Sequence, residues 1–233
     1  HDTVVQVDRL GTGHAVKVCT PALDRLGATK VVILSGDVPL LPGGTVVDIL
    51  SSEGLILGME LERPTGYGRV LTDAQGQVRD MVEEKDASPE QREIRLVNGG
   101  AYALPWTPLR AALQALKNDN AQKEFYLTDA VVAVAKAHPV SVSVRPEAEL
   151  LGMNSRLDQA HLQGLAAQAQ REAWMREGVT FLHPDSTLIG PRVVLARDVV
   201  LEPGVRLEGA CVVGEGARLG QGSILTDSRV GEG

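Results

Sequence analysis

The clearest chemical signal in this 233-residue sequence is VVILSGDVPLL, residues 31–41. A run of β-branched residues, typical of a strand, is followed directly by Gly36 and Asp37. Ligands of open parallel sheets bind just beyond the carboxyl ends of the strands. A glycine there lets a ligand approach the backbone, and a carboxylate oxygen suits Mg²⁺, which bridges phosphates. The pattern favours a ligand site at Asp37, with a carboxylate that caps the next turn as the alternative.

A second signal is the glycine-rich segment LGTGHA, residues 10–15, which follows Gln6 and leads into a helix-like stretch. Backbone N–H groups at a helix start can face a nucleotide. The Gln6 amide carries a donor and an acceptor, which match the edge of a pyrimidine base. An ordinary strand-to-helix turn explains the segment equally well. The segment lacks the GxxxxGK[ST] pattern, so P-loop chemistry is disfavoured.

Four further motifs place polar residues near turns or strand ends. A tight loop is enough to explain PTGYGR. The charged segment VEEKDA, which contains Glu83, is typical of a solvated face. Asn98 within an apolar strand is either satisfied by local backbone or turned toward a ligand. Asn154, taken alone, is explained as a helix N-cap. The motifs span residues 64–69, 82–87, 96–104 and 152–156.

Several classes of function are disfavoured. A net charge of −7 argues against binding of duplex nucleic acid, and 3% aromatic residues argue against a base-stacking sheet. Cys19 and Cys211 form no CxxC pair, which excludes a thiolate zinc site and favours a reducing compartment. The sequence contains no run of about eighteen apolar residues, so we expect no membrane-spanning helix.

Other common catalytic patterns are missing as well. No GxSxG elbow predicts a nucleophilic serine, and His161 is expected to be packed on the apolar face of a helix. The chain starts with His1, shows no signal peptide, and begins like the middle of a domain, so we expect a piece of a longer protein. The histidines without metal-ligand spacing are His14, His138, His161 and His183.

Strand-like and helix-like stretches alternate up to about Arg156, which predicts an α/β fold with a mainly parallel sheet. The first strand, 30–35, is expected to be buried on both faces, and 140–144 to be an edge strand. Residues 67–71 and 77–82 flank DAQG and predict a hairpin. The other expected strands are 54–61 and 94–104; the expected helices are 14–26, 44–52, 105–117 and 127–138, the last capped by Thr128 with Asp129.

Residues 155–177 predict one helix that connects two parts of the chain. Asn154 or Ser155 can cap its start, and Gly178 follows its end. Spacings of three and four residues predict one apolar face. That face comprises Leu157, His161, Leu162, Leu165, Ala169 and Ala173.

After this helix the sequence repeats every six residues. The first position of seven successive hexads is aliphatic, and the fifth is small or β-branched in all but the last. This period is the signature of a parallel β-helix, in which the leading side chains stack inside and Gly or Asp occupies the corners. The first positions are Ile189, Leu195, Leu201, Leu207, Val213, Leu219 and Leu225; the fifth are Val193, Val199, Val205, Cys211, Ala217, Ser223 and Arg229.

In this order, the motifs resemble one family, the bifunctional N-acetylglucosamine-1-phosphate uridyltransferase / glucosamine-1-phosphate N-acetyltransferase. The resemblance rests on Gln6 with LGTGHA, on GDVPL, PTGYGR, VEEKDA, VNGGAY and GMNSR, and on the helix and hexads that follow. It implies a Rossmann-like nucleotidyltransferase domain in residues 1–154, a linker helix in 155–178 and the start of a left-handed parallel β-helix in 179–233.

The resemblance also implies a reaction and a site. UMP would pass from UTP to N-acetylglucosamine 1-phosphate in a Mg²⁺-dependent step, giving UDP-N-acetylglucosamine and pyrophosphate. The account requires two oxygen-bearing side chains to meet at one rim of the sheet. Carried over, Gln6, Gly11 and Thr12 would contact uridine, Ser35 and Gly36 would line the nucleotide pocket, Asp37 and Asn154 would hold Mg²⁺ and serve catalysis, and Gly68, Glu83 and Asn98 would read the N-acetylglucosamine.

The chain departs from the family's pattern in three places. No glycine-rich phosphate clamp precedes His1, a serine stands at position 35 where the family often has an aromatic residue, and the acetyl-CoA pocket would lie beyond Gly233. We therefore expect acetyl transfer only in a longer parent protein, and almost no uridylyl transfer by this segment alone. The resemblance further implies a cytoplasmic homotrimer, associated through the β-helix, without nucleic-acid or membrane partners.

Two other interpretations stay open. One is a different sugar-1-phosphate nucleotidyltransferase that carries a β-helix, against which Glu83 with Asn98 favours an N-acetylated sugar. The other is a catalytically inactive β-helix scaffold. Asp37 and Asn154 argue against the scaffold, because it has no need of a pair of metal ligands.

Overall fold

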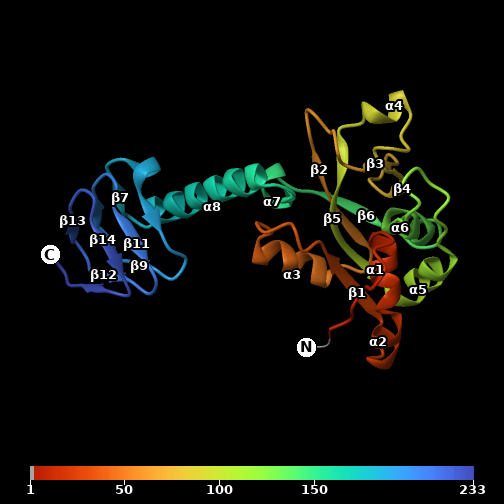
Figure 1. The fold of residues 1–233 in the computed structure, drawn as a ribbon, viewed down its shortest axis with the longest axis horizontal. Coiled ribbons are helices and arrows are strands. Elements are labelled where there is room, and N and C mark those ends of the chain that lie inside the picture. Colours follow the sequence, from red (N-terminus) through yellow and green to blue (C-terminus); the bar gives the residue numbers. More distant parts are fainter. Residues whose placement is uncertain (1–2) are drawn as a thin grey trace. The chain divides into compact units, whose positions relative to one another are not determined.

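The computed structural model describes residues 3–233. The chain forms two compact units, of which the first ends at Met153 and the second begins at Asn154. The first unit is built on a six-stranded sheet in the order β4-β3-β5-β2-β6, with β1 beside β5 (Figure 1). Its strands are β1 (Lys30–Leu34), β2 (Leu55–Glu60), β3 (Arg69–Thr72), β4 (Val78–Val82), β5 (Leu96–Pro105) and β6 (Ser141–Val144).

Helices cover both faces of this sheet. Successive side chains of β2 and β5 point to opposite faces, and each set packs against helices on its own face. Ile56 and Tyr102 pack with α5 and α6, whereas Leu57 and Ala101 pack with Ile49 of α3. The mixed α/β class expected from the sequence is therefore confirmed. The helices are α1 (Thr12–Val18), α2 (Thr20–Arg25), α3 (Gly43–Ser51), α4 (Pro89–Arg92), α5 (Trp106–Ala115), α6 (Leu127–Ala135) and α7 (Glu147–Leu150).

The expectation of a mainly parallel sheet is wrong. The central strand β5 runs antiparallel to β1, β2 and β3, and β3 is antiparallel to β4; among the described strands of this sheet, only β2 and β6 pair in parallel. The predicted hairpin is confirmed as β3 and β4, joined by a turn in which Asp73 Oδ1 accepts the N–H groups of Gln75 and Gln77. Because β1 and β2 are both antiparallel to β5, they run in the same direction, and their carboxyl ends lie at the same end of the sheet.

The burial expected for the first strand is also wrong. Among the described strands β1 pairs with β5 alone, so it lies at an edge of the sheet. Lys30–Ile33 are only half-buried, and Leu34 is 43% exposed. An unalternating β-branched run does not reveal whether both faces are covered, because it reports hydrophobicity rather than the number of neighbours. The stretch 140–144 does form the expected edge strand, β6.

In the second unit, α8 (Arg156–Arg176) begins with a capping box in which Ser155 accepts the Asp158 N–H. Ser155 is therefore the cap, not Asn154, and Gly178 ends the helix at φ 96°. The expected apolar face is wrong: Leu157 is 82% exposed and His161 is exposed. No helix within residues 3–233 has both the length and the apolar character needed to cross a membrane.

The hexads form three parallel sheets of three short strands each. Arg206 pairs with Leu188 on one side and Ile224 on the other, so the chain returns to the same sheet after eighteen residues, or three hexads. The leading Leu201 and Leu207 are buried, as predicted. The sheets are β7-β10-β13, β8-β11-β14 and β9-β12-β15, from β7 (Thr180–Phe181), β8 (Leu188–Ile189), β9 (Val194–Leu195), β10 (Val200–Leu201), β11 (Arg206–Glu208), β12 (Val212–Val213), β13 (Arg218–Leu219), β14 (Ile224–Thr226) and β15 (Arg229–Val230).

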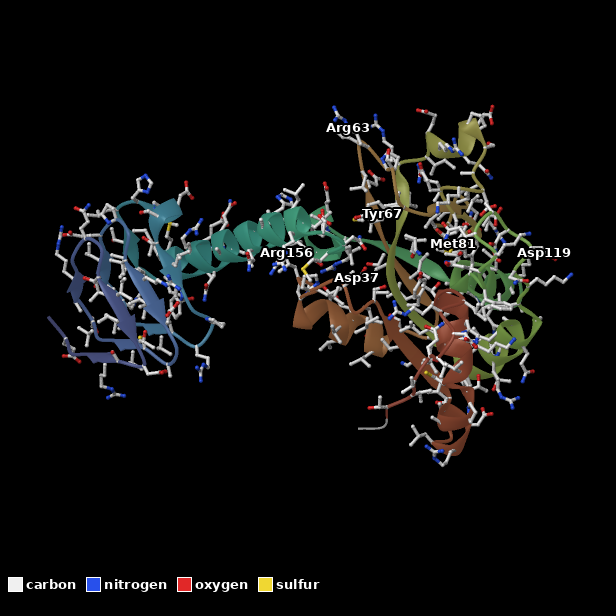
Figure 2. All side chains as sticks on the ribbon, in the orientation of Figure 1. Asp37, Arg63, Tyr67, Met81, Asp119 and Arg156 are labelled. Carbon is white, nitrogen blue, oxygen red and sulfur yellow. The ribbon has the colours of Figure 1, made fainter. Side chains whose placement is uncertain are left out.

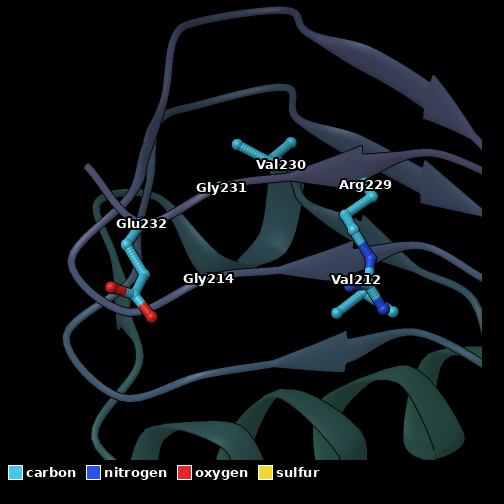
Figure 3. Close-up of a pocket in the computed structure, with 6 residues that line it drawn as sticks. All are labelled: Val212, Gly214, Arg229, Val230, Gly231 and Glu232. Atoms are coloured by element: carbon cyan, nitrogen blue, oxygen red, sulfur yellow. The ribbon is translucent and has the colours of Figure 1, made fainter.

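The turns between hexads use the residues predicted for corners. Asp198 and Gly204 adopt φ values of 59° and 75°, the left-handed region that Gly and Asp tolerate best. A shallow cavity of about 300 Å³ is lined by residues of β12, β15 and the turns that follow them (Figure 3). Arg229 and Glu232 lie at its two ends.

Candidate functional site

The glycine-rich segment of residues 10–15 is closed against the loop before α6. Gly13 N–H donates to the Phe125 carbonyl at 2.8 Å, and Phe125 N–H donates to the Leu10 carbonyl at 2.8 Å. Gly11 has φ 101°, and a Cβ there would lie 2.8 Å from the Phe125 oxygen. Both glycines are thus required by backbone-to-backbone contact.

The three residues expected to contact uridine surround one cavity. Gln6 Nε2 donates to the Gly11 carbonyl at 3.1 Å and lies 3.0 Å from His14 Nδ1. Thr12 follows Gly11 as the first residue of α1. The cavity, of about 270 Å³, is lined by Gln6, Arg9, Gly11, Thr12, Ala15 and Glu124.

At the end of β1, Ser35 is attached to the central strand. Its N–H and its hydroxyl both donate to the Gly100 carbonyl, at 3.2 and 3.1 Å. Gly100 has φ 72°, and a Cβ there would come within 2.6 Å of the Ser35 hydroxyl oxygen. Gly36, in contrast, has no atom within 4 Å of an added Cβ. The fold therefore leaves open space at Gly36, as a ligand contact would need.

Asp37 lies in the loop between β1 and α3 (Figure 2). Its carbonyl accepts the Met153 N–H at 2.8 Å, so the backbone is held at the end of the first unit. Its carboxylate is exposed, and within residues 3–233 it makes no hydrogen bond or ion pair. The oxygens are therefore free for a cation. Asn154 follows Met153 as the first residue of the second unit, and a shared ion stays a prediction.

Gly68, Glu83 and Asn98 come together at one end of the sheet. The Gly68 carbonyl accepts the Asn98 N–H at 2.9 Å, and a Cβ on Gly68 would lie 3.2 Å from Glu83 Oε2. The Asn98 amide donates to the Tyr102 hydroxyl at 2.7 Å and accepts the Gly100 N–H at 3.1 Å. Local groups therefore orient the Asn98 amide, and its contact with a ligand stays a prediction.

The solvated-face interpretation of VEEKDA is wrong for both glutamates. The Thr128 hydroxyl donates to Glu83 Oε1 at 3.0 Å, and Glu84 pairs at 2.7 Å with the buried guanidinium of Arg69. Burial raises the pKa of Glu83, the Thr128 hydrogen bond opposes the rise, and the charges of Asp129 and Asp86 add to it. Arg69 and Val82 are paired across β3 and β4, so the two glutamates directly follow the last paired residue of the hairpin.

Sequence reasoning missed residues at the start of α6. Thr128 was expected to cap this helix, but α6 begins at Leu127 without a side-chain cap, and the Thr128 hydroxyl is used on Glu83. The Tyr126 hydroxyl donates to Asp86 at 3.1 Å, and burial followed by the Asp86 carboxylate raises the pKa of Tyr126 to about 12. A cap motif and a ligand-facing motif share the same residue types, so no sequence signal separates them.

Two series of contacts connect the predicted groups. At the start of α6, Leu127 N–H donates to the Thr12 hydroxyl at 3.3 Å, and the next residue, Thr128, contacts Glu83. In β5, Gly100 bonds both to Asn98 and to Ser35. Predicted residues from distant parts of the sequence are therefore joined in two groups within the first unit.

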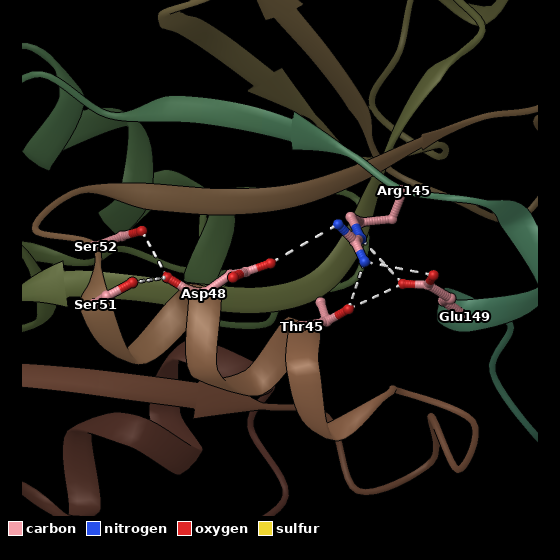
Figure 4. A network of polar contacts seen from close by, with 6 residues as sticks. All are labelled: Thr45, Asp48, Ser51, Ser52, Arg145 and Glu149. Carbon is pink, nitrogen blue, oxygen red and sulfur yellow. Dashed lines mark hydrogen bonds and ion pairs between the residues drawn. The ribbon is translucent and has the colours of Figure 1, made fainter.

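A polar network supports the loop that carries Asp37. Arg145, which follows β6, donates to the buried Thr45 hydroxyl at 2.6 Å and to Glu149 Oε2 at 3.0 Å (Figure 4). Thr45 in turn donates to Glu149 at 3.1 Å. The network ties α3 to α7, and so fixes the two segments that lead to Asp37 and Met153.

The donor set limits what metal the site can hold. Within residues 3–233, no group of three or more His, Cys, Asp or Glu side chains is arranged to bind an ion. Mg²⁺ does not need such a cage, because it keeps several waters and is bound through one or two carboxylates and substrate phosphates. The free carboxylate of Asp37 suits that mode and not a zinc cage.

Comparison with known proteins finds several similar sequences, although no family model matches the chain. The "Bifunctional protein GlmU" of Synechococcus sp. (strain JA-2-3B'a(2-13)) is 42% identical over 99% of the chain, which covers 37% of that protein. Those of Synechococcus sp. (strain CC9605) and Corynebacterium efficiens are 40% and 39% identical over 98% of the chain, covering 51% and 49% of each. The resemblance expected from the motifs is confirmed, and the chain spans about a third to a half of these relatives.

Among solved structures, a UDP-glucose pyrophosphorylase complexed with UDP-glucose is similar at a TM-score of 0.48 and 20% identity. The match covers 72% of this chain and 64% of that one.

Proposed function

Because the chain is similar to bifunctional GlmU proteins over almost its whole length, we propose that its first unit is the greater part of a sugar-1-phosphate uridyltransferase. The proposed reaction transfers UMP from UTP to N-acetylglucosamine 1-phosphate and releases pyrophosphate. The observation that carries the proposal is that contacts join the predicted residues in two groups, from Gln6 through Thr128 to Glu83 and from Gly68 through Asn98 to Ser35.

The region around Glu83 and the cavity beside Gln6 suit different parts of the ligand. The Glu83 carboxylate accepts the Thr128 hydroxyl hydrogen, and it has Asp86 and Asp129 as charged neighbours. Such an acidic region repels phosphate and attracts the hydroxyl and amide hydrogens of a sugar. Gly68 and Asn98 complete this end, which we assign to N-acetylglucosamine. The cavity beside Gln6, Gly11 and Thr12 is assigned to the uracil and its ribose.

We assign Asp37 and Asn154 as the protein ligands of a divalent cation, Mg²⁺. The unpaired Asp37 carboxylate fits an ion that is completed by water and phosphate oxygens. When bound, the ion would offset the negative charge of the attacking and leaving phosphates. The chain's own contribution is positional: the Met153–Asp37 hydrogen bond and the Arg145 network hold the loop, while Ser35 and Gly36 shape the space for the nucleotide. The sugar phosphate oxygen would attack the α-phosphorus of UTP in this space.

For the second unit, we propose a left-handed parallel β-helix that starts an acetyltransferase domain in a longer parent protein. The eighteen-residue return between paired strands and the buried hexad leads support a coil of three faces. Acetyl transfer from acetyl-CoA and association into homotrimers through this domain belong to the same proposal.

Ligand binding tests the first-unit assignment without requiring turnover. The 233-residue chain is titrated by calorimetry with UDP-N-acetylglucosamine and with UDP-glucose, each with and without Mg²⁺. We expect tighter binding of the acetylated sugar, loss of the preference in Glu83→Gln, and loss of the Mg²⁺ effect in Asp37→Ala. Arg79→Gln, an exposed residue in the same hairpin, serves as control. Equal binding of both sugars would favour a different sugar nucleotide, and no binding of either would favour a scaffold.

A further inference from the structure

The side chain beside the predicted base-reading amide has a defined hydrogen-bonding role. Gln6 Nε2 is 3.1 Å from the Gly11 carbonyl oxygen, which can only accept a hydrogen bond. The nitrogen end of the amide must therefore face Gly11. The same Nε2 lies 3.0 Å from His14 Nδ1, so Nδ1 must be the accepting, hydrogen-free nitrogen of the imidazole.

This arrangement uses both hydrogens of the Gln6 amide and leaves its carbonyl oxygen free. Within residues 3–233 no hydrogen bond engages Gln6 Oε1, and Gln6 lines the cavity shared with Thr12. The reversed amide would place Oε1 against the Gly11 oxygen, which is repulsive whichever tautomer His14 adopts. The His14 ring is itself packed against Phe125, with centroids 6.1 Å apart.

We propose that His14 is a positioning residue for base selection: with its hydrogen on Nε2, it holds the Gln6 amide so that only an acceptor is presented to the base. A base with an N–H donor at that edge, as in uracil, is then favoured over one with a bare nitrogen there, as in cytosine. This inference rests on the proposed binding of a nucleotide at Gln6. His14 touches no substrate in this account and acts through the amide.

The tautomer is tested first, on the 233-residue chain, without ligand. Long-range ¹H–¹⁵N NMR spectra of the imidazoles distinguish a bare Nδ1 from a protonated one, and His14→Gln assigns the signal among the five histidines. We expect His14 to carry its hydrogen on Nε2 at pH 8. A hydrogen on Nδ1 would overturn the inference, whatever the ligand results.

Base selection is tested next, by titration of uridine and cytidine 5′-diphosphates into the wild type, His14→Phe and a control, His138→Phe, at an exposed position of the same unit. His14→Phe keeps an aromatic ring beside Phe125 but removes the acceptor. We expect its preference for uridine to fall about fivefold, the factor for one hydrogen bond of about 1 kcal/mol. The control should keep the full preference.

The outcomes separate the two claims. Unchanged preference in a folded His14→Phe, checked by its melting temperature, overturns the role of His14 while nucleotide binding stands. If the wild type binds neither diphosphate although His14 has the expected tautomer, the proposed function fails and base selection fails with it.

Discussion

The buried guanidinium of Arg69 predicts a large loss of stability when its charge is removed. The side chain is 2% exposed and reaches from β3 to Arg92, the last residue of α4. It donates to the carbonyls of Tyr67 and Arg92 and pairs with Glu84 at 2.7 Å. Arg69→Met keeps much of the volume but removes the donor to these two carbonyls and the cation beside the Glu84 carboxylate. At about 1 kcal/mol for each group left unpaired, the expected cost is about 3 kcal/mol.

Urea unfolding can measure this cost for the first unit alone. The chain has two tryptophans, of which Trp106 is buried in the first unit and Trp174 lies in α8. In a Trp174→Phe background, fluorescence therefore reports the unfolding around Trp106. With a urea slope of about 2 kcal/mol/M, Arg69→Met should lower the midpoint by about 1.5 M.

The matched control is Arg79→Met in the neighbouring strand. Arg79 also pairs with a carboxylate, that of Asp73, but its side chain is 65% exposed. Exposed pairs contribute at most about 1 kcal/mol, so this midpoint should move by less than about 0.5 M. Equal shifts in the two variants would refute the reasoning that burial, and not the ion pair as such, sets the cost.

Three further predictions concern the site. Burial raises the pKa of Glu83 above its ordinary 4.5, so the folded state keeps this proton to higher pH than the unfolded state, and the unfolding free energy should fall as pH rises through that window. Glu83→Gln should flatten this fall in urea midpoints between pH 4 and 7; an unchanged slope would contradict it. Thr128→Val removes the hydrogen bond that opposes the shift, so the pKa of Glu83 should rise further in a ¹³C NMR titration, whereas Thr72→Val, on an exposed residue of β3, should leave it unchanged. Gly36→Ala meets no atom within 4 Å and should change stability by less than about 0.5 kcal/mol while weakening nucleotide binding; Gly11→Ala, at φ 101° against the Phe125 oxygen, should cost about 2 kcal/mol. Nucleotide affinity unchanged in Gly36→Ala would remove that residue from the pocket.

Sequence periodicity predicted the inward side chains of the second unit well, because each hexad repeats the same local rule. An aliphatic lead at every sixth position specifies an inward side chain, as Leu201 and Leu207 show. The residue types at the turns were equally predictable, since Asp198 and Gly204 adopt backbone conformations that few residues tolerate. Here the strand pairing recurs about every eighteen residues, which is three times the hexad period of the sequence.

The first unit was less predictable because its order depends on pairings that no local pattern encodes. The run at 30–34 has the composition of a central strand but lies at an edge, and β5 reverses direction against its neighbours. The candidate residues were found by motif, yet the contact between Glu83 and Thr128 was hidden, because a threonine and an aspartate at a helix start are typical of a cap.

The contrast between the two units has a consequence for how the chain acquires its structure during synthesis. Hydrogen bonds of the first unit join residues more than a hundred positions apart, for example Thr12 and Leu127, which are separated by 115 positions. Its Asp37 loop therefore cannot be fixed before Met153 has left the ribosome. In the second unit each strand from β10 onward pairs with the strand about eighteen residues before it. This unit can therefore form strand by strand while the chain is being synthesised.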